Sequence, residues 1–380
     1  MDATEFEDVL DAVRRFIRED VVPREREIDE TDLVPGEIRD KAVDMGLFGY
    51  SFPEEYGGMA TSVTEDALLA MEFGYTTVAF RSMFGTNVGI AGGVLLNYGS
   101  KEQQEEWLPR LVGGQIASFA LTEPEAGSDP AGMRTRAVDT GDGHFEITGA
   151  KRFITNAPVA DVFMLFARTA EGARGTDGIS CLLVEAGTPG LTVGPKDRKM
   201  GQAGAWTSEV FFDKVRVPHS ALIGGMQGKG FNAAMRSLSK GRLHAAALCV
   251  GTMVRLVEES VEHARNTTQG GTPIGEFQLV QAMLAEMKTL LDAGRALVLD
   301  AARRYDAGED TKFGPSTAKL FCTEAACKAA DLAVQIHGGM GYMREATVER
   351  IYRDIRITRI YEGSSEIQKL IIGRALLRST

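Results

Sequence analysis

One carboxylate near the end of the chain has a setting suited to catalysis, in residues 359–368. Glu362 precedes Gly363, which lets the backbone bend tightly and lets a ligand approach. Ser365 and Gln368 have the spacing of a capping box, which predicts that a helix begins there. A turn fixed in this way gives a general base the defined position that it needs. The helix dipole alone also explains a glutamate near a helix start, so other segments must decide.

Three further segments carry residue types that bind a planar or phosphorylated ligand. Residues 120–129 contain Gly, Ser and Pro and predict a loop whose backbone N–H groups are exposed. In residues 151–156, Phe153 and Thr155 suit stacking on a ring and hydrogen bonding to its edge. Residues 335–342 form a Gly-rich turn that suits close approach to a pyrophosphate. Taken alone, each segment is equally explained as an ordinary turn, cap or helix end.

Composition limits the kinds of ligand. The chain has 380 residues, 44% apolar and 25% charged, with 42 Lys and Arg against 53 Asp and Glu, a net charge of −11. This acidic balance argues against a nucleic-acid or anionic-membrane binder, which needs a basic face. The four cysteines show no C-x-x-C spacing, so we expect neither a metal site nor a disulfide framework. They are interpreted as buried small residues in a reducing compartment.

The sequence also bears on localisation. No apolar run approaches the length of about 18 residues that suggests a transmembrane helix, so no membrane insertion is expected. Residues 1–7 are acidic and lack the basic start and apolar core of a signal peptide. These features predict a cytoplasmic protein.

The elements that must position these segments fall into three parts. Residues 1–118 show helical periodicity, for example at Phe6, Val9 and Val13, and predict an N-terminal α-helical domain. Residues 119–226 hold short β-branched or aromatic runs separated by turns, which predict a small antiparallel β-barrel. Residues 227–380 hold four long helical segments and predict a four-helix bundle. The expected fold class is therefore mostly α with a β middle domain.

In this order and spacing, the segments resemble those of the acyl-CoA dehydrogenase family, over about residues 46–378. The resemblance rests on the following matched stretches: Pro53 to Gly58, Leu121 to Pro124 with Gly127 to Asp129, Phe153 to Asn156, Lys199 to Gly201, Val215 to Pro218, Pro273 to Gln278, Gln335 to Gly339, and Tyr361 to Gly363.

The resemblance implies an FAD enzyme that desaturates an acyl-CoA to the trans-2-enoyl-CoA, as in fatty-acid β-oxidation. Glu362 matches the family's base, which takes the α-proton while flavin N5 takes the β-hydride. Some relatives carry the base on a bundle helix instead, where this chain has Gly241. Since Gly241 has no side chain, Glu362 is the predicted base. The resemblance also implies electron-transfer flavoprotein as acceptor and a homo-oligomer, a dimer of dimers.

Other site residues follow from the same resemblance. The implied FAD contacts are Leu121, Thr122, Ser128, Phe153, Thr155, Gln278, Gln335, Gly338, Gly339, Ser364 and Glu366. The implied substrate contacts are Ser128, Arg242, Tyr361 and Gly363.

The chain departs from the family's pattern where the flavin's far end is expected. Thr267 stands where an arginine is usual, and Gly270 where a phenylalanine is usual. An arginine–phosphate pair is worth about 1.5–3 kcal/mol, so these residues predict weaker FAD binding. Ser239 replaces a frequent aspartate, which leaves a carrier-protein thioester open as substrate. The resemblance also leaves open the same chemistry with oxygen as electron acceptor, an acyl-CoA oxidase. Thr267 and Gly270 are compatible with a non-catalytic relative whose FAD binding is weakened.

Overall fold

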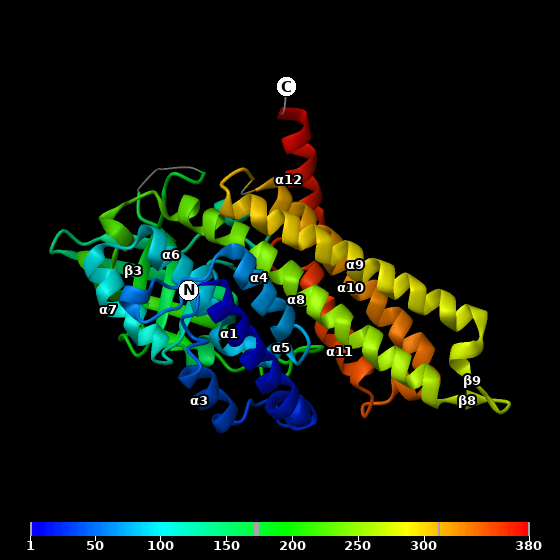
Figure 1. The fold of residues 1–380 in the computed structure, drawn as a ribbon. Coiled ribbons are helices and arrows are strands. Elements are labelled where there is room, and N and C mark those ends of the chain that lie inside the picture. The colour runs from blue at the N-terminus through cyan, green and yellow to red at the C-terminus, as the bar shows by residue number, and fades with distance from the viewer. Residues whose placement is uncertain (1, 171–174, 311, 379–380) are drawn as a thin grey trace.

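The computed structural model describes residues 2–170, 175–310 and 312–378. The fold is mostly helical with a β region in the middle of the chain, which confirms the predicted fold class (Figure 1). No helix in these ranges is both long and apolar enough to cross a membrane.

Seven α-helices precede the sheet in the part of the chain that the structure describes. Capping boxes at Asp2, Ser62 and Ser100 fix the starts of three of them, since each side chain accepts a backbone N–H of the first turn. Their bounds are α1 Ala3–Phe16, α2 Glu25–Thr31, α3 Gly36–Asp44, α4 Val63–Phe73, α5 Val78–Val88, α6 Ile90–Tyr98 and α7 Lys101–Val112.

The middle strands form one seven-stranded sheet in the order β1-β4-β2-β3-β7-β6, with β5 also paired to β4. Its path does not return to β1 among the described residues, so the sheet is a half-barrel. The predicted antiparallel pairing holds for four strand pairs, whereas β1 and β2 pair in parallel with β4. The strands are β1 Ala117–Ala120, β2 Arg136–Asp139, β3 His144–Thr155, β4 Val162–Arg168, β5 Ile179–Glu185, β6 Leu191–Val193 and β7 Thr207–Pro218.

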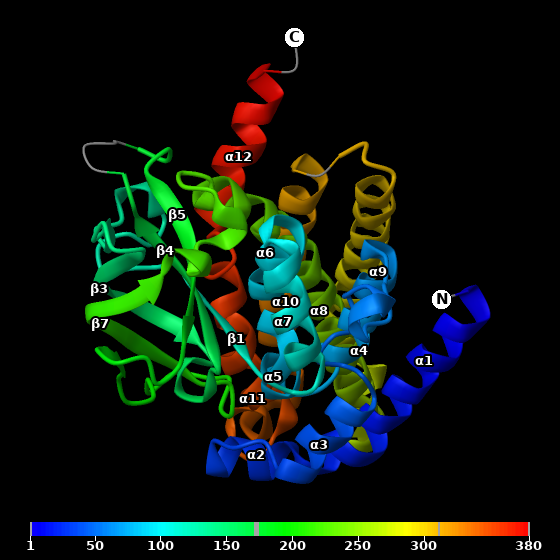
Figure 2. The ribbon, with the colours of Figure 1, turned by 90° about the vertical axis from the view of Figure 1, so that its left-hand side faces the viewer.

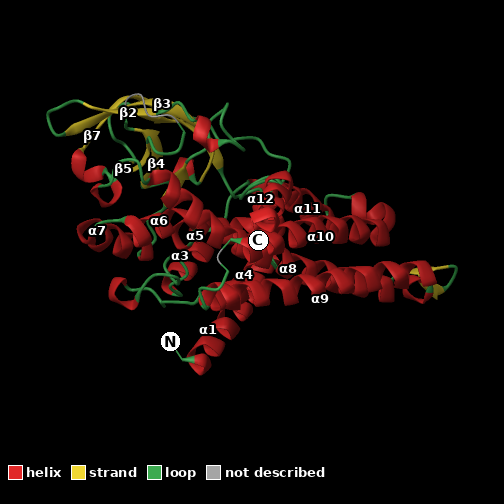
Figure 3. Cartoon of the chain, turned by 90° about the horizontal axis from the view of Figure 1, so that it is seen from above, coloured by secondary structure: helices red, strands yellow, loops and turns green. Residues whose placement is uncertain are grey.

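Long helices return after the sheet and extend away from it (Figure 3). Helices α8, α9 and α10 pack on one another, and α4 packs against α8 and α9. Helix α12 packs against α10 and then projects outward (Figure 2). The bounds are α8 Gly230–Asn266, β8 Thr268–Gln269, β9 Thr272–Pro273, α9 Gln278–Asp306, α10 Phe313–His337, α11 Thr347–Ile355 and α12 Ser365–Arg378.

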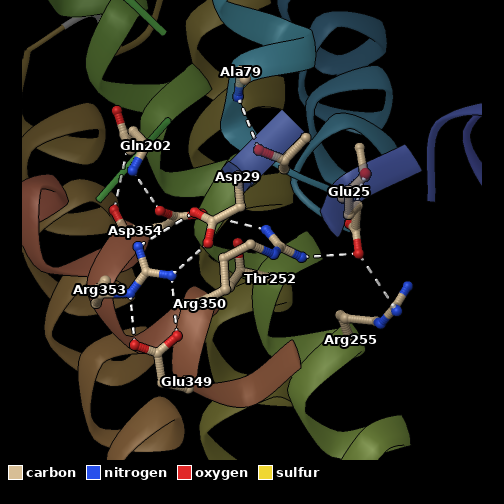
Figure 4. A network of polar contacts seen from close by, with 12 residues as sticks. Glu25, Asp29, Ala79, Gln202, Thr252, Arg255, Glu349, Arg350, Arg353 and Asp354 are labelled. Atoms are coloured by element: carbon tan, nitrogen blue, oxygen red, sulfur yellow. Dashed lines mark hydrogen bonds and ion pairs between the residues drawn. The ribbon is translucent and has the colours of Figure 1, made fainter. Parts of the chain in front are cut away.

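A buried charge network joins the three parts of the chain (Figure 4). Arg350 on α11 lies 2.8 Å from the Glu25 carboxylate on α2 and 3.2 Å from that of Asp354. The backbone N–H of Gln202, in the loop before β7, donates to the Asp354 carboxylate. Since Asp354 lies just before the segment that carries Glu362, this network fixes the sheet relative to the candidate site.

Candidate active site

The turn that carries Glu362 lies between a 3-10 turn, Arg356–Arg359, and α12. Glu362 and Gly363 both have left-handed backbone conformations, with φ values of 56° and 84°. Such a φ is uncommon for a residue with a side chain, and it persists only where the surroundings hold it. We call residues 361–364 the base turn.

Two side chains hold the base turn in this conformation. Lys319 Nζ, fully buried on α10, donates to the Gly363 carbonyl at 2.7 Å. The side-chain amide of Gln368 donates to the carbonyls of Glu362 and Gly363 at 3.1 and 3.0 Å. Neither support was predicted from the sequence, because each acts through a backbone carbonyl rather than a recognisable motif.

The predicted Ser365–Gln368 capping box is wrong. Ser365 Oγ instead donates to the Glu324 carboxylate at 2.6 Å, and Gln368 points back to the base turn. The Oγ of Ser364 accepts the backbone N–H of Ile367 at 3.4 Å and takes the capping position. The helix begins where expected, but Gln368 holds the turn rather than the helix start.

The Glu362 carboxylate lies against the face of α8 at Gly241. A Cβ atom added at Gly241 would lie 2.7 Å from Glu362 Oε2, so a residue with a side chain there would require the carboxylate to shift from this position. Oε2 is buried and has no hydrogen-bond partner among the residues that the structure describes. Burial raises the pKa of Glu362, while the charges of Arg81, Arg242 and Lys319 oppose that rise.

The cations beside Glu362 are themselves buried. Burial lowers the pKa of Lys319 to about 8. Arg242 on α8 is 8% exposed, burial lowers its pKa, and its Nε is buried without a partner. A buried carboxylate oxygen and a buried guanidinium N–H that both lack partners mark a place prepared for a polar ligand.

The second part of the site lies on the sheet. The backbone N–H of Arg152 donates to the Thr122 carbonyl at 2.9 Å, and Ser118 Oγ donates to the Thr155 carbonyl at 2.8 Å. The structure therefore brings together the loop after β1 and the end of β3, as the predicted flavin contacts require. Leu121 is buried, and the side chains of Thr122 and Thr155 are partly accessible.

A buried ion pair supports this loop and was not predicted. Lys151 Nζ, with no exposed surface, lies 2.8 Å from Glu123 Oε1 and donates to the Leu121 carbonyl at 3.1 Å. The Glu123 carboxylate also accepts the backbone N–H groups of Arg134 and Thr135. Because a buried charge is costly without partners, this arrangement holds the loop in one conformation.

Phe153 presents an exposed aromatic ring beside the loop, with the Arg152 guanidinium carbon 4.7 Å from the ring centroid. The pairing of β3 with β7 is irregular between Lys151 and Ile154, and Phe153 has a φ of 57° within this bulge. A bulge re-aims the side chain that it carries, and the Phe153 ring is 62% exposed. An exposed ring beside a loop of backbone polar groups fits the planar ring of a flavin.

The remaining predicted contacts do not gather at one place. Ser364 lies partly buried in the base turn, while Ser128 and Glu366 are exposed. Gln278, Gln335, Gly338 and Gly339 are exposed at the opposite end of the bundle, beside the β8–β9 hairpin (Figure 1). Along α10, Gln335 is 16 residues beyond Lys319, or roughly 24 Å. We call this end, residues 263–280 and 335–343, the bundle tip.

The two unusual residues Thr267 and Gly270 lie at the bundle tip. Gly270 and Gly271 have φ values of 60° and 84° and form the two-residue turn between β8 and β9. A tight hairpin turn of this kind requires positive φ at both positions, which favours glycine. Thr267 ends α8, where its backbone N–H donates to the His263 carbonyl.

The geometry agrees with the comparisons to known proteins. Three family models cover nearly the whole chain: the acyl-CoA dehydrogenase N-terminal domain matches residues 3–115, the middle domain residues 118–215 and the C-terminal domain residues 228–377.

Similar proteins of known name span the same length. An acyl-CoA dehydrogenase of Bacillus subtilis (strain 168) is 39% identical over 97% of both chains. An acryloyl-CoA reductase (NADH) of Anaerotignum propionicum is 39% identical over 96% of this chain and 92% of its own. The solved butyryl-CoA dehydrogenase of Megasphaera elsdenii superposes with a TM-score of 0.94 at 34% identity, over 98% of each chain.

Proposed function

This chain belongs to the acyl-CoA dehydrogenase family of FAD-dependent oxidoreductases, and on that premise we propose that it desaturates an acyl-CoA thioester between its α and β carbons. The product is the trans-2-enoyl thioester, and Glu362 is the base that removes the α-proton. The observation that carries this proposal is the position of the buried Glu362 carboxylate against Gly241, where the absence of a side chain leaves it space.

The surroundings of Glu362 suit proton abstraction. Burial raises the pKa of its carboxyl, which brings a glutamate closer to the range where a base is effective at neutral pH. Its Oε2 has no hydrogen-bond partner to compete with the incoming proton. Lys319 and Gln368 hold the turn, so the carboxylate is positioned before substrate arrives.

An α-proton becomes acidic only when the thioester oxygen is stabilised as negative charge develops. The backbone N–H of Glu362 donates no hydrogen bond among the described residues and is free to bind that oxygen. Arg242, buried with a free Nε–H, is proposed to contact the CoA thioester. The Leu121–Thr122 loop, Phe153 and Thr155 would hold the ring of FAD, which would supply the acceptor, N5, for the hydride of the β-carbon.

The proposed FAD contacts divide between two places. The ring is held by the Leu121–Thr122 loop, Phe153 and Thr155, and the far end by residues of the bundle tip. Because the bundle tip is roughly 24 Å from the base turn along α10, we propose that it binds the far end of a flavin seated in a second copy. This proposal requires a dimer, and we propose a dimer of dimers with electron-transfer flavoprotein as electron acceptor.

The direction of the reaction has a second candidate. The Anaerotignum propionicum relative is named for reduction of an acryloyl thioester, which is the reverse of dehydrogenation. The same base position then returns a proton to the α-carbon. Two further alternatives involve the same site: oxygen as the electron acceptor, as in an oxidase, and a carrier-protein thioester as the substrate.

Anaerobic spectroscopy of the FAD-loaded protein tests this proposal. Saturated acyl-CoAs of varied length and branching are expected to bleach the yellow flavin, and enoyl-CoAs to restore colour to the chemically reduced protein. Slow recolouring in air, accelerated by electron-transfer flavoprotein, supports a dehydrogenase, whereas rapid recolouring in air indicates an oxidase. A protein that FAD cannot reconstitute, or whose flavin no thioester reduces, contradicts the proposal.

A further inference from the structure

Arg81 is a cation beside the base that the proposed mechanism does not use. It lies on α5, and its guanidinium fills the space above Gly85, one turn further along the helix. A Cβ atom at Gly85 would lie 2.5 Å from Arg81 Cζ, so a side chain there would require the guanidinium to shift.

A chain of buried polar groups anchors one edge of this guanidinium. Arg81 Nε donates to His244 Nε2 at 2.8 Å. A guanidinium only donates, so His244 Nε2 accepts, and the ring proton is on Nδ1, which lies 3.2 Å from Asp66 Oδ2. Tyr50 donates to the other Asp66 oxygen at 2.5 Å. Tyr50, Asp66 and His244 are all buried.

The anchor leaves the other edge of the guanidinium without a partner. Arg81 forms no ion pair, and its two terminal nitrogens form no hydrogen bond, among the residues that the structure describes. The planar edge of an arginine matches a carboxylate, with which it forms two parallel hydrogen bonds. A partly buried cation held so firmly, with this edge free, is poised for an anionic ligand.

The anchor of Arg81 and the residue that faces the base lie close together on α8. His244, which holds Arg81, and Gly241, which faces the Glu362 carboxylate, are three residues apart on one face of α8. That separation is roughly 5 Å along the helix. A few methylene groups span it, counted from the carbon that Glu362 deprotonates.

We propose that Arg81 binds a carboxylate at the far end of the acyl chain, so that the substrate is the CoA thioester of a short dicarboxylic acid. This inference rests on the proposed function and specifies its substrate class. A monocarboxylic acyl chain, which ends in a methyl group, places apolar atoms against the free edge of the guanidinium and gives its two terminal nitrogens no acceptor, an unfavourable arrangement. The Asp66–His244 pair sets the orientation of Arg81, so both are positioning residues.

Paired substrates of equal chain length test this inference. Glutaryl-CoA is compared with pentanoyl-CoA, and adipyl-CoA with hexanoyl-CoA, in the wild type and in Arg81→Met. The wild type is expected to have the higher kcat/KM for the dicarboxylic member of a pair. Arg81→Met is expected to lose roughly ten- to hundredfold with that member and to change little with its partner. Because Arg81 also lowers the pKa of Glu362, each variant is compared on the pH plateau of its own profile.

A second measurement separates this inference from the proposed function. In a Glu362→Gln background, binding of glutaryl-CoA and pentanoyl-CoA is followed by calorimetry, which needs no turnover. Tighter binding of glutaryl-CoA that Arg81→Met abolishes and Arg81→Lys partly keeps supports the inference, even if no thioester bleaches the flavin. Equal binding of both thioesters, or equal loss of both in Arg81→Met, overturns it and leaves the dehydrogenase proposal standing if pentanoyl-CoA bleaches the wild type. Melting temperature and flavin content check that each variant is folded.

Discussion

The base turn and the bundle tip are both candidate parts of one site, but they differ in their surroundings. The base turn is held by contacts within the chain, whereas the bundle tip is exposed to solvent. At the base turn, Lys319 and Gln368 fix the backbone, and Gly241 makes room for the carboxylate. At the bundle tip, large apolar side chains face solvent: Phe277 is 43% exposed, Leu279 80%, Met340 61% and Tyr342 84%.

This difference teaches which part of the function is encoded within one chain. Acid–base chemistry needs fixed positions and a low local dielectric, and a single copy supplies both at the base turn. Large exposed apolar side chains gathered in one region mark a surface that another molecule covers. We therefore expect changes at the base turn to alter catalysis at constant assembly, and changes at the bundle tip to alter assembly and FAD retention.

Glu362→Gln is expected to have the largest effect. The amide cannot accept the α-proton, so the anaerobic rate of flavin reduction should fall by about 10²–10⁴. Acyl-CoA binding and flavin content should stay close to wild type, since no bond that holds the base turn uses the carboxylate. Stopped-flow absorbance measures the rate and calorimetry the binding. Reduction at the wild-type rate removes Glu362 from its role.

Gly241→Ala tests whether the position of the Glu362 carboxylate against α8 matters for catalysis. The added Cβ would lie 2.7 Å from Glu362 Oε2 and 3.2 Å from Ile90, so the carboxylate must move. We expect the rate of flavin reduction to fall by about ten- to a hundredfold, since small misplacement of a catalytic group is costly. Alanine is favoured over glycine in a helix by about 1 kcal/mol, so thermal stability should fall little. An unchanged rate would show that the carboxylate lies elsewhere in the functional state.

The sequence predicted features that depend on nearby residues, and it did not predict contacts between residues that are far apart along the chain. Helix periodicity and the order of the short strand-like runs were enough for the fold class. The resemblance to the family named segments from the loop after β1 and the end of β3, which the structure brings together. The anchor of Arg81 was not predicted, because it joins residues 163 and 178 positions apart on three helices. The pairing of β1 with β4 in parallel was missed for the same reason, since short strands do not specify their partners.

Leu279→Glu tests whether a second copy covers the apolar surface of the bundle tip. A charge at a covered apolar position should weaken association, so the molar mass in solution and the FAD bound per chain should both fall. The melting temperature of the separated chain should show that it remains folded, because Leu279 packs little within its own chain. Leu33→Glu, an exposed leucine outside the bundle tip, is the matched control and should keep the wild-type mass. Sedimentation and flavin absorbance measure both quantities.

Thr267→Arg tests whether the bundle tip retains FAD weakly. If this residue faces a flavin pyrophosphate in a partner copy, the new charge should tighten FAD binding by roughly tenfold or more. Equilibrium dialysis of wild type and variant gives the comparison, and Thr268→Arg, the exposed neighbour, serves as control. Wild-type protein that keeps one FAD per chain after extensive dialysis would contradict weak binding.

The smallest effect that we expect is the shift of the pH profile in Lys319→Met, which is separate from the lower plateau rate expected because the variant loses the hydrogen bond to the Gly363 carbonyl. The Lys319 charge lowers the pKa of Glu362, so its removal should raise that pKa. Glu362 must be deprotonated to act, and the acid limb of kcat/KM should therefore move to higher pH. Glu276→Gln, an exposed change at the bundle tip, should leave the acid limb in place. The bundle tip lies roughly 24 Å from the base turn along α10, which exceeds the screening length of about 8 Å at physiological salt. Equal shifts in both variants would show that the two regions are electrostatically coupled.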